Sequence, residues 1–358
     1  MSGYTLCPKA QNLQPYDPVE GTYRVRLDAN ESFLLPTLAD RKKMAEAAEE
    51  VAFNRYPDPL AKDLCAAFAG LYGIDPALVT AGNGSDELIS VIFSTFLQKG
   101  EKVLTLAPDF SMYRFYASLA ENPCLVLQKD DSLCIDVDRV IRTIREEGVR
   151  LLIFSNPCNP TSVGLKREDV RRIIRETDAL VILDEAYMDF WDQSLLAEAG
   201  EYENLIILRT CSKMLGMAAL RCGFAVACPT LTGILRAAKS PYNVNSVTQA
   251  MAAVVLQNPD YLREYRPLLM ASRDMLLEGF QRLEQEGLVE RVYPTCTNFV
   301  FVKTRQATAI WEFLKDRGII VRRFGEDYLR ITAGTQAENQ EVLACTAFWL
   351  RQGKESGA

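Results

Sequence analysis

Lys213 is the residue of this sequence whose type and position most clearly suggest a chemical role. It lies in the segment Thr210-Cys211-Ser212-Lys213, directly after the apolar run Leu205–Arg209. Such a run predicts a buried strand, and a lysine at the carboxyl end of a strand lies where open α/β sheets bind ligands. An amine in that position can act as a nucleophile or a base. Most lysines are only solvated charges, so this interpretation depends on the residues that accompany Lys213.

Histidine is absent from the chain, which excludes Ser-His-Asp and Cys-His catalytic triads and zinc sites built on histidine. The ten cysteines include no C-x-x-C pair, so they predict reduced thiols of a cytosolic protein and no metal site. If the chain is an enzyme, lysine, tyrosine or carboxylate side chains must move its protons.

Three further motifs follow or precede predicted elements. Asp184-Glu185-Ala186-Tyr187 ends one apolar run, and Asn156–Thr161 follows another. Gly82–Glu87 precedes an apolar helix at Leu88–Leu97, so backbone N–H groups there can cradle a phosphate. Each motif alone has a simpler interpretation: Asp184 as a helix cap, the Asn-Pro pairs as a turn, and the Gly-rich segment as a capped helix start.

The elements that must position these motifs alternate along the middle of the chain. Short continuous apolar runs predict strands covered on both faces, and Lys166–Thr177 is predicted as an amphipathic helix between two of them. Strand, helix and strand in succession predict βαβ units and a largely parallel sheet. The predicted strands are Lys102–Leu106, Arg150–Ser155, Leu180–Glu185, Leu205–Arg209 and Cys222–Cys228.

A second, smaller α+β unit is predicted after Pro241, because long helical patterns there give way to short strands. The predicted helices are Ser246–Leu256, Tyr261–Glu286 and Ala307–Asp316, and the predicted strands are Val292, Asn298–Val302, Ile319–Arg322 and Tyr328–Thr332. We expect an N-terminal segment (1–50) that packs with the small domain, a large domain (51–256), a connecting helix (257–286) and a small domain (287–358). Residues 1–30 are expected to be irregular, and residues 351–358 to be frayed.

The composition is that of a globular protein, because 48% of the 358 residues are apolar and 24% are charged. No apolar run approaches the roughly 18 residues that span a bilayer, and residues 1–26 show no secretory leader pattern. The net charge of −7 argues against nucleic acid, whose binding proteins usually carry a basic field. We therefore expect a cytoplasmic protein with neither a nucleic-acid nor a membrane partner.

In this order and spacing, the motifs resemble those of fold-type-I aminotransferases that use pyridoxal 5′-phosphate, and the resemblance runs from about Tyr16 to Thr335. Within that superfamily the chain is most similar to the histidinol-phosphate aminotransferase branch. The motifs that carry the resemblance are Leu27-Asp28-Ala29-Asn30-Glu31, Arg55-Tyr56-Pro57, Gly82–Glu87, Pro108–Tyr113, Asp184–Tyr187, Arg209–Lys213, Pro241–Asn245 and Leu329–Thr335. The resemblance implies an α/β fold in which helices flank the mostly parallel sheet of a large domain, with a smaller α+β domain beside it.

The resemblance also implies catalytic roles. Lys213 would form a Schiff base with the cofactor and then shuttle a proton. Asp184 would pair with the ring nitrogen, Tyr187 and Asn159 would hydrogen-bond the phenolic oxygen of the ring, and Phe110 would stack on it. The implied phosphate-binding residues are Gly84, Ser85 and Asp86 through their backbone, Thr210, Ser212 and Arg221 through their side chains, and Tyr56 from the second subunit of a homodimer.

On the substrate side, Arg330 and Arg322 match positions that bind an anionic group. Tyr16, Asn30 and Tyr242 match positions near the entrance. The chain departs from the family pattern at four places: Ser162 and Ala219 replace common glycines, Ser32-Phe33 replaces Asn-Pro, and the segment Arg323–Asp327 is short.

The implied reaction is ping-pong transamination between histidinol phosphate and 2-oxoglutarate. The alternatives are an aromatic amino acid aminotransferase, a threonine-phosphate decarboxylase and the cofactor-binding module of a transcription regulator. The usual N-terminal pattern of the decarboxylase differs from Leu-Asp-Ala-Asn-Glu. Regulators of that kind carry a DNA-binding domain ahead of the matched region, for which we expect no room here, and the charge of −7 also disfavours them.

Overall fold

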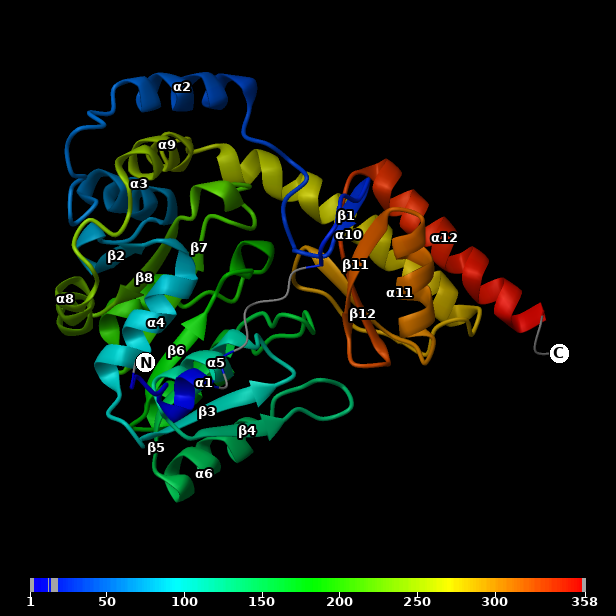
Figure 1. The fold of residues 1–358 in the computed structure, drawn as a ribbon, viewed down its shortest axis with the longest axis horizontal. Coiled ribbons are helices and arrows are strands. Elements are labelled where there is room, and N and C mark those ends of the chain that lie inside the picture. The colour runs from blue at the N-terminus through cyan, green and yellow to red at the C-terminus, as the bar shows by residue number, and fades with distance from the viewer. Residues whose placement is uncertain (1–2, 12, 14–18, 356–358) are drawn as a thin grey trace.

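The computed structural model describes residues 3–11, 13 and 19–355, so Tyr16 lies outside the described residues. A seven-stranded sheet, in the order β2-β8-β7-β6-β5-β3-β4, forms the centre of the larger part (Figure 1). All its strands are parallel except β8, which runs antiparallel to both neighbours. The strands are β2 (Val79–Gly82), β3 (Lys102–Ala107), β4 (Cys124–Gln128), β5 (Val149–Ser155), β6 (Leu180–Asp184), β7 (Leu205–Thr210) and β8 (Gly223–Ala227).

Helices cover both faces of this sheet, which explains why its strands are continuous apolar runs. Along β6, Val181 and Leu183 face one apolar core and Ile182 faces the other. The first core contains residues of α3 (Lys62–Tyr72), α6 (Val137–Glu147), α7 (Arg167–Glu176) and α9 (Ser246–Leu256). The second contains residues of α4 (Gly84–Phe96), α5 (Met112–Leu119) and α8 (Pro229–Ala238).

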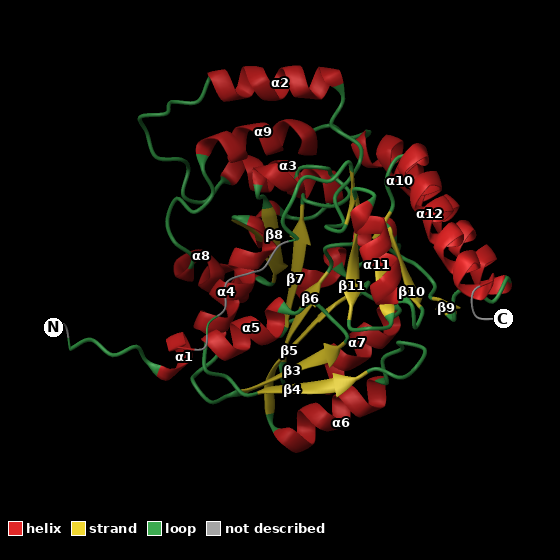
Figure 2. Ribbon diagram, turned by 45° about the vertical axis from the view of Figure 1, so that its right-hand side comes forward, coloured by secondary structure: helices red, strands yellow, loops and turns green. Residues whose placement is uncertain are grey.

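The smaller part is built on a five-stranded sheet, in the order β1-β11-β12-β10-β9. Its strands are β1 (Val25–Leu27), β9 (Arg291–Val292), β10 (Phe299–Lys303), β11 (Ile319–Phe324) and β12 (Tyr328–Thr332). The helices α10 (Tyr261–Gln285), α11 (Ala307–Asp316) and α12 (Gln336–Glu355) pack with these strands around a separate apolar core. The long helix α10 leads from the large sheet to this part of the molecule (Figures 1 and 2).

The N-terminal residues divide between the two parts. Strand β1 pairs in parallel with β11 in the small sheet, whereas α2 (Leu38–Glu49) lies against α9 beside the large sheet, as Figures 1 and 2 both show. The short helices are α1 (Pro8–Gln11) and four 3-10 turns at Pro76–Leu78, Met188–Phe190, Leu196–Glu201 and Ala218–Leu220.

Two sequence expectations about the chain ends were wrong. Residues 1–30 are not uniformly irregular, because β1 buries Val25 and Leu27 against the small-domain core. Helix α12 continues through Glu355 rather than fraying from residue 351, because Leu350 is buried in that core and Arg351 pairs with Glu286 at 2.9 Å. Within the described ranges, none of the helices has the length and apolarity needed to cross a membrane.

Candidate active site

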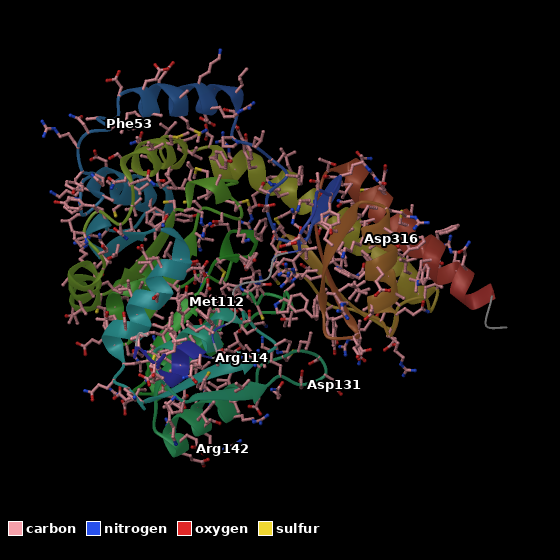
Figure 3. The ribbon with its side chains drawn as sticks, in the orientation of Figure 1. Phe53, Met112, Arg114, Asp131, Arg142 and Asp316 are labelled. Atoms are coloured by element: carbon pink, nitrogen blue, oxygen red, sulfur yellow. The ribbon has the colours of Figure 1, made fainter. Side chains whose placement is uncertain are left out.

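A cavity of about 760 Å³ lies at the carboxyl ends of the parallel strands, between the large sheet and β11–β12 of the small sheet. Its wall includes Met112 and Arg114 of α5, which Figure 3 labels near the centre of the molecule. Most residues predicted to bind cofactor or substrate meet here. They are Asn30, Ser85, Asp86, Phe110, Asn159, Asp184, Tyr187, Thr210, Ser212, Lys213, Arg221, Arg322 and Arg330.

Lys213 is half-buried in this cavity, three residues beyond the end of β7. Its Nζ donates a hydrogen bond to the carbonyl of Ala29 at 2.9 Å and lies 5.7 Å from the centre of the Tyr187 ring. The amine is therefore held between the segment that follows β1 and the loop that follows β6. It lies close enough to solvent for a small carbonyl compound to reach it.

Asp184 is the last residue of β6, and its carboxylate is buried at the base of the cavity. It accepts hydrogen bonds from the Tyr113 hydroxyl at 2.7 Å and from the Ala186 N–H at 3.0 Å. Burial raises the pKa of Asp184 to about 6, although both hydrogen bonds act to lower it. A cation placed against this carboxylate would offset the energetic cost of burying its negative charge.

The first turn of α4 approaches the cavity from the adjacent edge of the sheet. Asn83 directly precedes the helix, and the first N–H groups of a helix have no acceptor within it. Gly84 has a φ of +79°, and a Cβ there would lie 2.7 Å from Nη2 of Arg221. A Cβ on Gly223 of β8 would lie 2.5 Å from the backbone of Gly84. Two glycines thus allow this turn to lie directly beside the guanidinium.

Arg221 completes a cradle for an anion. Its Nη1 donates to the Ser212 hydroxyl at 3.3 Å, and its Nη2 lies 3.9 Å from the Asp86 carboxylate. The Thr210 hydroxyl in turn donates to Ser212 at 3.1 Å. Hydroxyl donors, a guanidinium and helix N–H groups together form a typical phosphate site.

Arg322 and Arg330 lie side by side on neighbouring strands of the small sheet. They are directly paired residues of the antiparallel strands β11 and β12, and both line the cavity. Arg330 is buried, and it donates to the Asn159 side chain and to the Asp28 carbonyl. Like charges directly opposite on neighbouring strands destabilise a sheet, so this pair favours an anion between them.

Gly84 lies beside the Arg221 guanidinium without lining the cavity itself, and Tyr56 and Tyr242 do not line it either. The two tyrosine rings stack on each other with their centres 4.6 Å apart, and Tyr56 is 80% exposed. Tyr56 does not line the cavity of its own chain, and its expected contact with the cofactor phosphate of a second subunit stays a prediction. The placement of Tyr16 stays a prediction.

Four residues that complete the cavity or its support have no role that the sequence motifs indicated. Arg26 and Asp28 lie in its wall and form an ion pair at 3.1 Å. Tyr113 holds Asp184, and Asp109 bonds the backbone and hydroxyl of Ser155. Tyr113 belonged to a motif that the resemblance used, but only the fold brings its hydroxyl to Asp184.

The residues present fit pyridoxal 5′-phosphate. The cavity combines an accessible lysine amine and a buried carboxylate suited to a cation. It also has an anion cradle in which glycine leaves space that a Cβ would fill. The family model for class I and II aminotransferases matches residues 24–345. The chain therefore belongs to this family of pyridoxal-phosphate-dependent enzymes.

Named relatives lie within the same family. The chain is 38% identical over 340 residues to a histidinol-phosphate aminotransferase of Clostridium kluyveri. This match covers 93% of this chain and 96% of the relative. It is 39% identical over 339 residues to the corresponding enzyme of Clostridium novyi, with 94% of each chain covered. A crystal structure of histidinol-phosphate aminotransferase from Sinorhizobium meliloti in complex with pyridoxal-5′-phosphate has the same fold, with a TM-score of 0.88, 24% identity and 98% of each chain covered.

Proposed function

We propose that this protein transfers the amino group of histidinol phosphate to 2-oxoglutarate. The observation that carries the proposal is the Arg322–Arg330 pair. These two arginines are paired on neighbouring strands, and both line the same cavity. A phosphate monoester has the charge and the oxygen geometry for two such forks. The relatives from both Clostridium species, which are named for this substrate, support the same assignment.

The second substrate must use the same site in a ping-pong reaction. 2-Oxoglutarate has a distal carboxylate that the same two guanidinium groups can bind in place of the phosphate. Arg330 is also held by Asn159 and by the backbone of Asp28, so it needs no rearrangement between the two half-reactions. The pair thus supplies one anion site for two chemically different substrates.

The side chains of this chain have distinct parts in the reaction. Pyridoxal phosphate, when bound, supplies the electron sink for the carbanion at the substrate Cα. Lys213 would remove the proton from the substrate Cα and deliver it to C4′ of the cofactor. Asp184 holds a proton at the ring nitrogen, since its buried carboxylate is stabilised by that cation. Tyr187 and Asn159 bind the phenolic oxygen of the ring.

We further propose that the enzyme is a cytoplasmic homodimer whose interface includes Tyr56. This aromatic residue and Phe53, which is 77% exposed, lie in the loop that follows α2 (Figure 3 labels Phe53). A groove of about 870 Å³ lies beside them, lined by residues of 51–71 and 246–259. Large exposed aromatic side chains beside a groove are typical of an interface, and two-fold dimers are the commonest closed assembly.

An aromatic amino acid is the second candidate donor. Its carboxylate would bind Arg330, but it has no second anion for Arg322. The test is a panel of histidinol phosphate, phenylalanine, tyrosine and threonine phosphate with 2-oxoglutarate, with glutamate and carbon dioxide both measured. We expect histidinol phosphate to give the highest kcat/KM and no carbon dioxide to form. Preference for phenylalanine, or decarboxylation of threonine phosphate, would overturn the substrate assignment and leave the cofactor assignment intact.

A further inference from the structure

We propose that Lys129 is a positioning residue, which acts through Asp109 to hold the two loops that carry Phe110 and Asn159 in the cavity. Lys129 directly follows β4, and its Nζ lies 3.9 Å from the Asp109 carboxylate. Both side chains are only 2% exposed. A buried lysine and aspartate outside the reacting groups need a reason to be there, because burying charges is costly.

Lys129 joins loops that follow three neighbouring strands of the large sheet. Its backbone N–H donates to the Ala107 carbonyl at 2.8 Å, at the end of β3. Its Nζ donates to the Pro108 carbonyl at 2.9 Å, in the loop after β3, and to the Cys158 thiol at 3.0 Å, in the loop after β5. Burial raises the pKa of the Cys158 thiol, so the sulfur stays neutral and serves as an acceptor for the ammonium.

Asp109 carries this connection to the cavity. Its carboxylate accepts from both the hydroxyl and the backbone N–H of Ser155, the last residue of β5. The Ser155 hydroxyl oxygen accepts in turn from the Asn159 N–H at 3.1 Å, and the Asn159 side chain accepts from Arg330. A continuous series of contacts therefore links the ammonium of Lys129 to a guanidinium of the proposed substrate site.

The same carboxylate fixes the aromatic wall of the cavity. Asp109 accepts from the N–H of Phe110 at 2.8 Å, so one charged group holds the backbone of Phe110 and, through Ser155, that of Asn159. Without Lys129, burial would favour a protonated Asp109, which loses part of its capacity to accept these bonds. Both loops would then loosen, and small displacements of groups around a substrate are costly in rate.

The test compares Lys129→Met and Ser155→Ala with a matched control, Lys99→Met, which removes an exposed lysine paired with Glu121 at 2.9 Å. Hydrogen exchange of the holoenzyme is followed in peptides covering 108–113 and 154–160. We expect faster exchange in both peptides for Lys129→Met, and in 154–160 for Ser155→Ala. We also expect kcat/KM to fall at least tenfold in both variants, mainly through a higher KM for the amino donor and for 2-oxoglutarate. The control should match the wild type.

A second substitution tests whether charge compensation is the cause. Asp109→Asn removes the other charge of the same pair. The double variant Lys129→Met with Asp109→Asn should therefore lose kcat/KM by clearly less than the product of the two single fold-losses. Losses that multiply would overturn the proposal. So would exchange that rises equally in residues 210–221, since that result indicates general destabilisation.

Ser155→Ala removes a single hydroxyl and tests the connection even if Lys129→Met does not fold. Unchanged exchange and kcat/KM within twofold of wild type in Ser155→Ala would overturn the proposal. The inference rests on the proposed substrate site, but the exchange measurement does not depend on which amine reacts. A protein that prefers another amino donor and still shows the local exchange change would refute the proposed substrate and leave the role of Lys129 standing.

Discussion

The side-chain amide of Asn30 donates a hydrogen bond to the Tyr187 hydroxyl at 2.8 Å, joining the segment after β1 to the loop after β6. The other end of this amide accepts from the Thr332 hydroxyl of β12 at 3.0 Å. Asn30 has a φ of 55°, and the Asn298 side chain donates to its carbonyl at 3.2 Å. The orientation of the Tyr187 hydroxyl therefore depends on the small domain.

Asn30→Ala should lower kcat about tenfold, because the Tyr187 hydroxyl loses a buried partner worth about 1–1.5 kcal/mol. Tyr187→Phe removes the other half of the same bond. In a double-mutant cycle of kcat, the double variant should lose clearly less than the sum of the two single losses. Additive losses would show that Asn30 does not act through Tyr187.

Asp184→Asn should separate stability from activity. Because burial raises the pKa of Asp184 from 3.8 to about 6, the folded cofactor-free protein holds this proton more tightly than the unfolded chain does. The resulting stabilisation is complete below about pH 4 and is lost as the pH rises through 6. The cofactor-free variant should thus exceed the wild type in free energy of unfolding above pH 7, by on the order of 3 kcal/mol.

Urea unfolding between pH 4 and pH 8 measures this difference, which should disappear at the acidic end. The holoenzyme of the same variant should lose turnover by orders of magnitude, since an amide cannot stabilise a cationic ring nitrogen. Turnover within a fewfold of wild type would show that Asp184 does not have this role.

Borohydride should attach the cofactor covalently to a peptide that contains Lys213. The expectation follows from the position of its amine beside Tyr187, in the same cavity as the anion cradle formed by Ser212 and Arg221. Peptide mapping after reduction identifies the labelled residue. A label on another lysine, such as the buried Lys239, would contradict the assignment.

Inactive Tyr56→Ala and Lys213→Ala proteins should regain activity when they are mixed, dissociated and reassociated. In a hybrid dimer, one site would combine the intact Lys213 of one subunit with the intact Tyr56 of the other. If Tyr56 acts within its own chain, no activity returns. Sedimentation of the wild type as a monomer would contradict the dimer directly.

Arg322→Ala should lower kcat/KM for histidinol phosphate by at least ~1.5 kcal/mol, the lower range for a hydrogen bond to a charged group. The effect on phenylalanine or tyrosine should be much smaller, because their single carboxylate uses Arg330. Arg323→Ala is the matched control, since that exposed side chain bonds Thr308 at 2.9 Å outside the cavity. Equal losses for both substrate classes would contradict the proposed division between the two arginines.

The meeting of Lys213, Asp184 and Asn159 could be predicted from the sequence. Each follows or ends a continuous apolar run, and parallel strands place such positions at one edge of a sheet. The runs predicted strands β3, β5, β6, β7 and β8 to within two residues at each end. Strands that are buried on both faces are almost entirely apolar, so they can be recognised in the sequence without knowledge of their neighbours in the sheet.

Contacts that depend on register between distant segments could not be predicted. Strand β4 was missed because it is short and its residues are only partly buried, and Lys129 was missed with it. The bond between Tyr113 and Asp184 joins residues 71 positions apart. Neither partner's local sequence specifies the other, since the sheet alone determines which loops meet.

Ser162 shows why a departure from a family pattern is hard to interpret from sequence. It replaces a common glycine and does adopt a left-handed φ of 63°. Its hydroxyl, however, forms hydrogen bonds with the Thr295 and Thr297 hydroxyls, both at 2.6 Å, and accepts from the Cys296 N–H at 3.0 Å. These bonds offset a backbone cost of about 1–2 kcal/mol. The turn is therefore tied to the loop before β10 rather than disturbed.

The pairing of β1 with β11 sets the order in which this chain can mature on the ribosome. Val25 lies beside Ile319 and Leu27 beside Val321, so β1 pairs with a strand that is synthesised much later. Residues 25–27 have no partner in the small sheet until residues 319–321 have been synthesised, so closure of this sheet requires a contact between distant segments. Because the same segment brings Asn30 to Tyr187, the cavity is completed only after β11 has been synthesised.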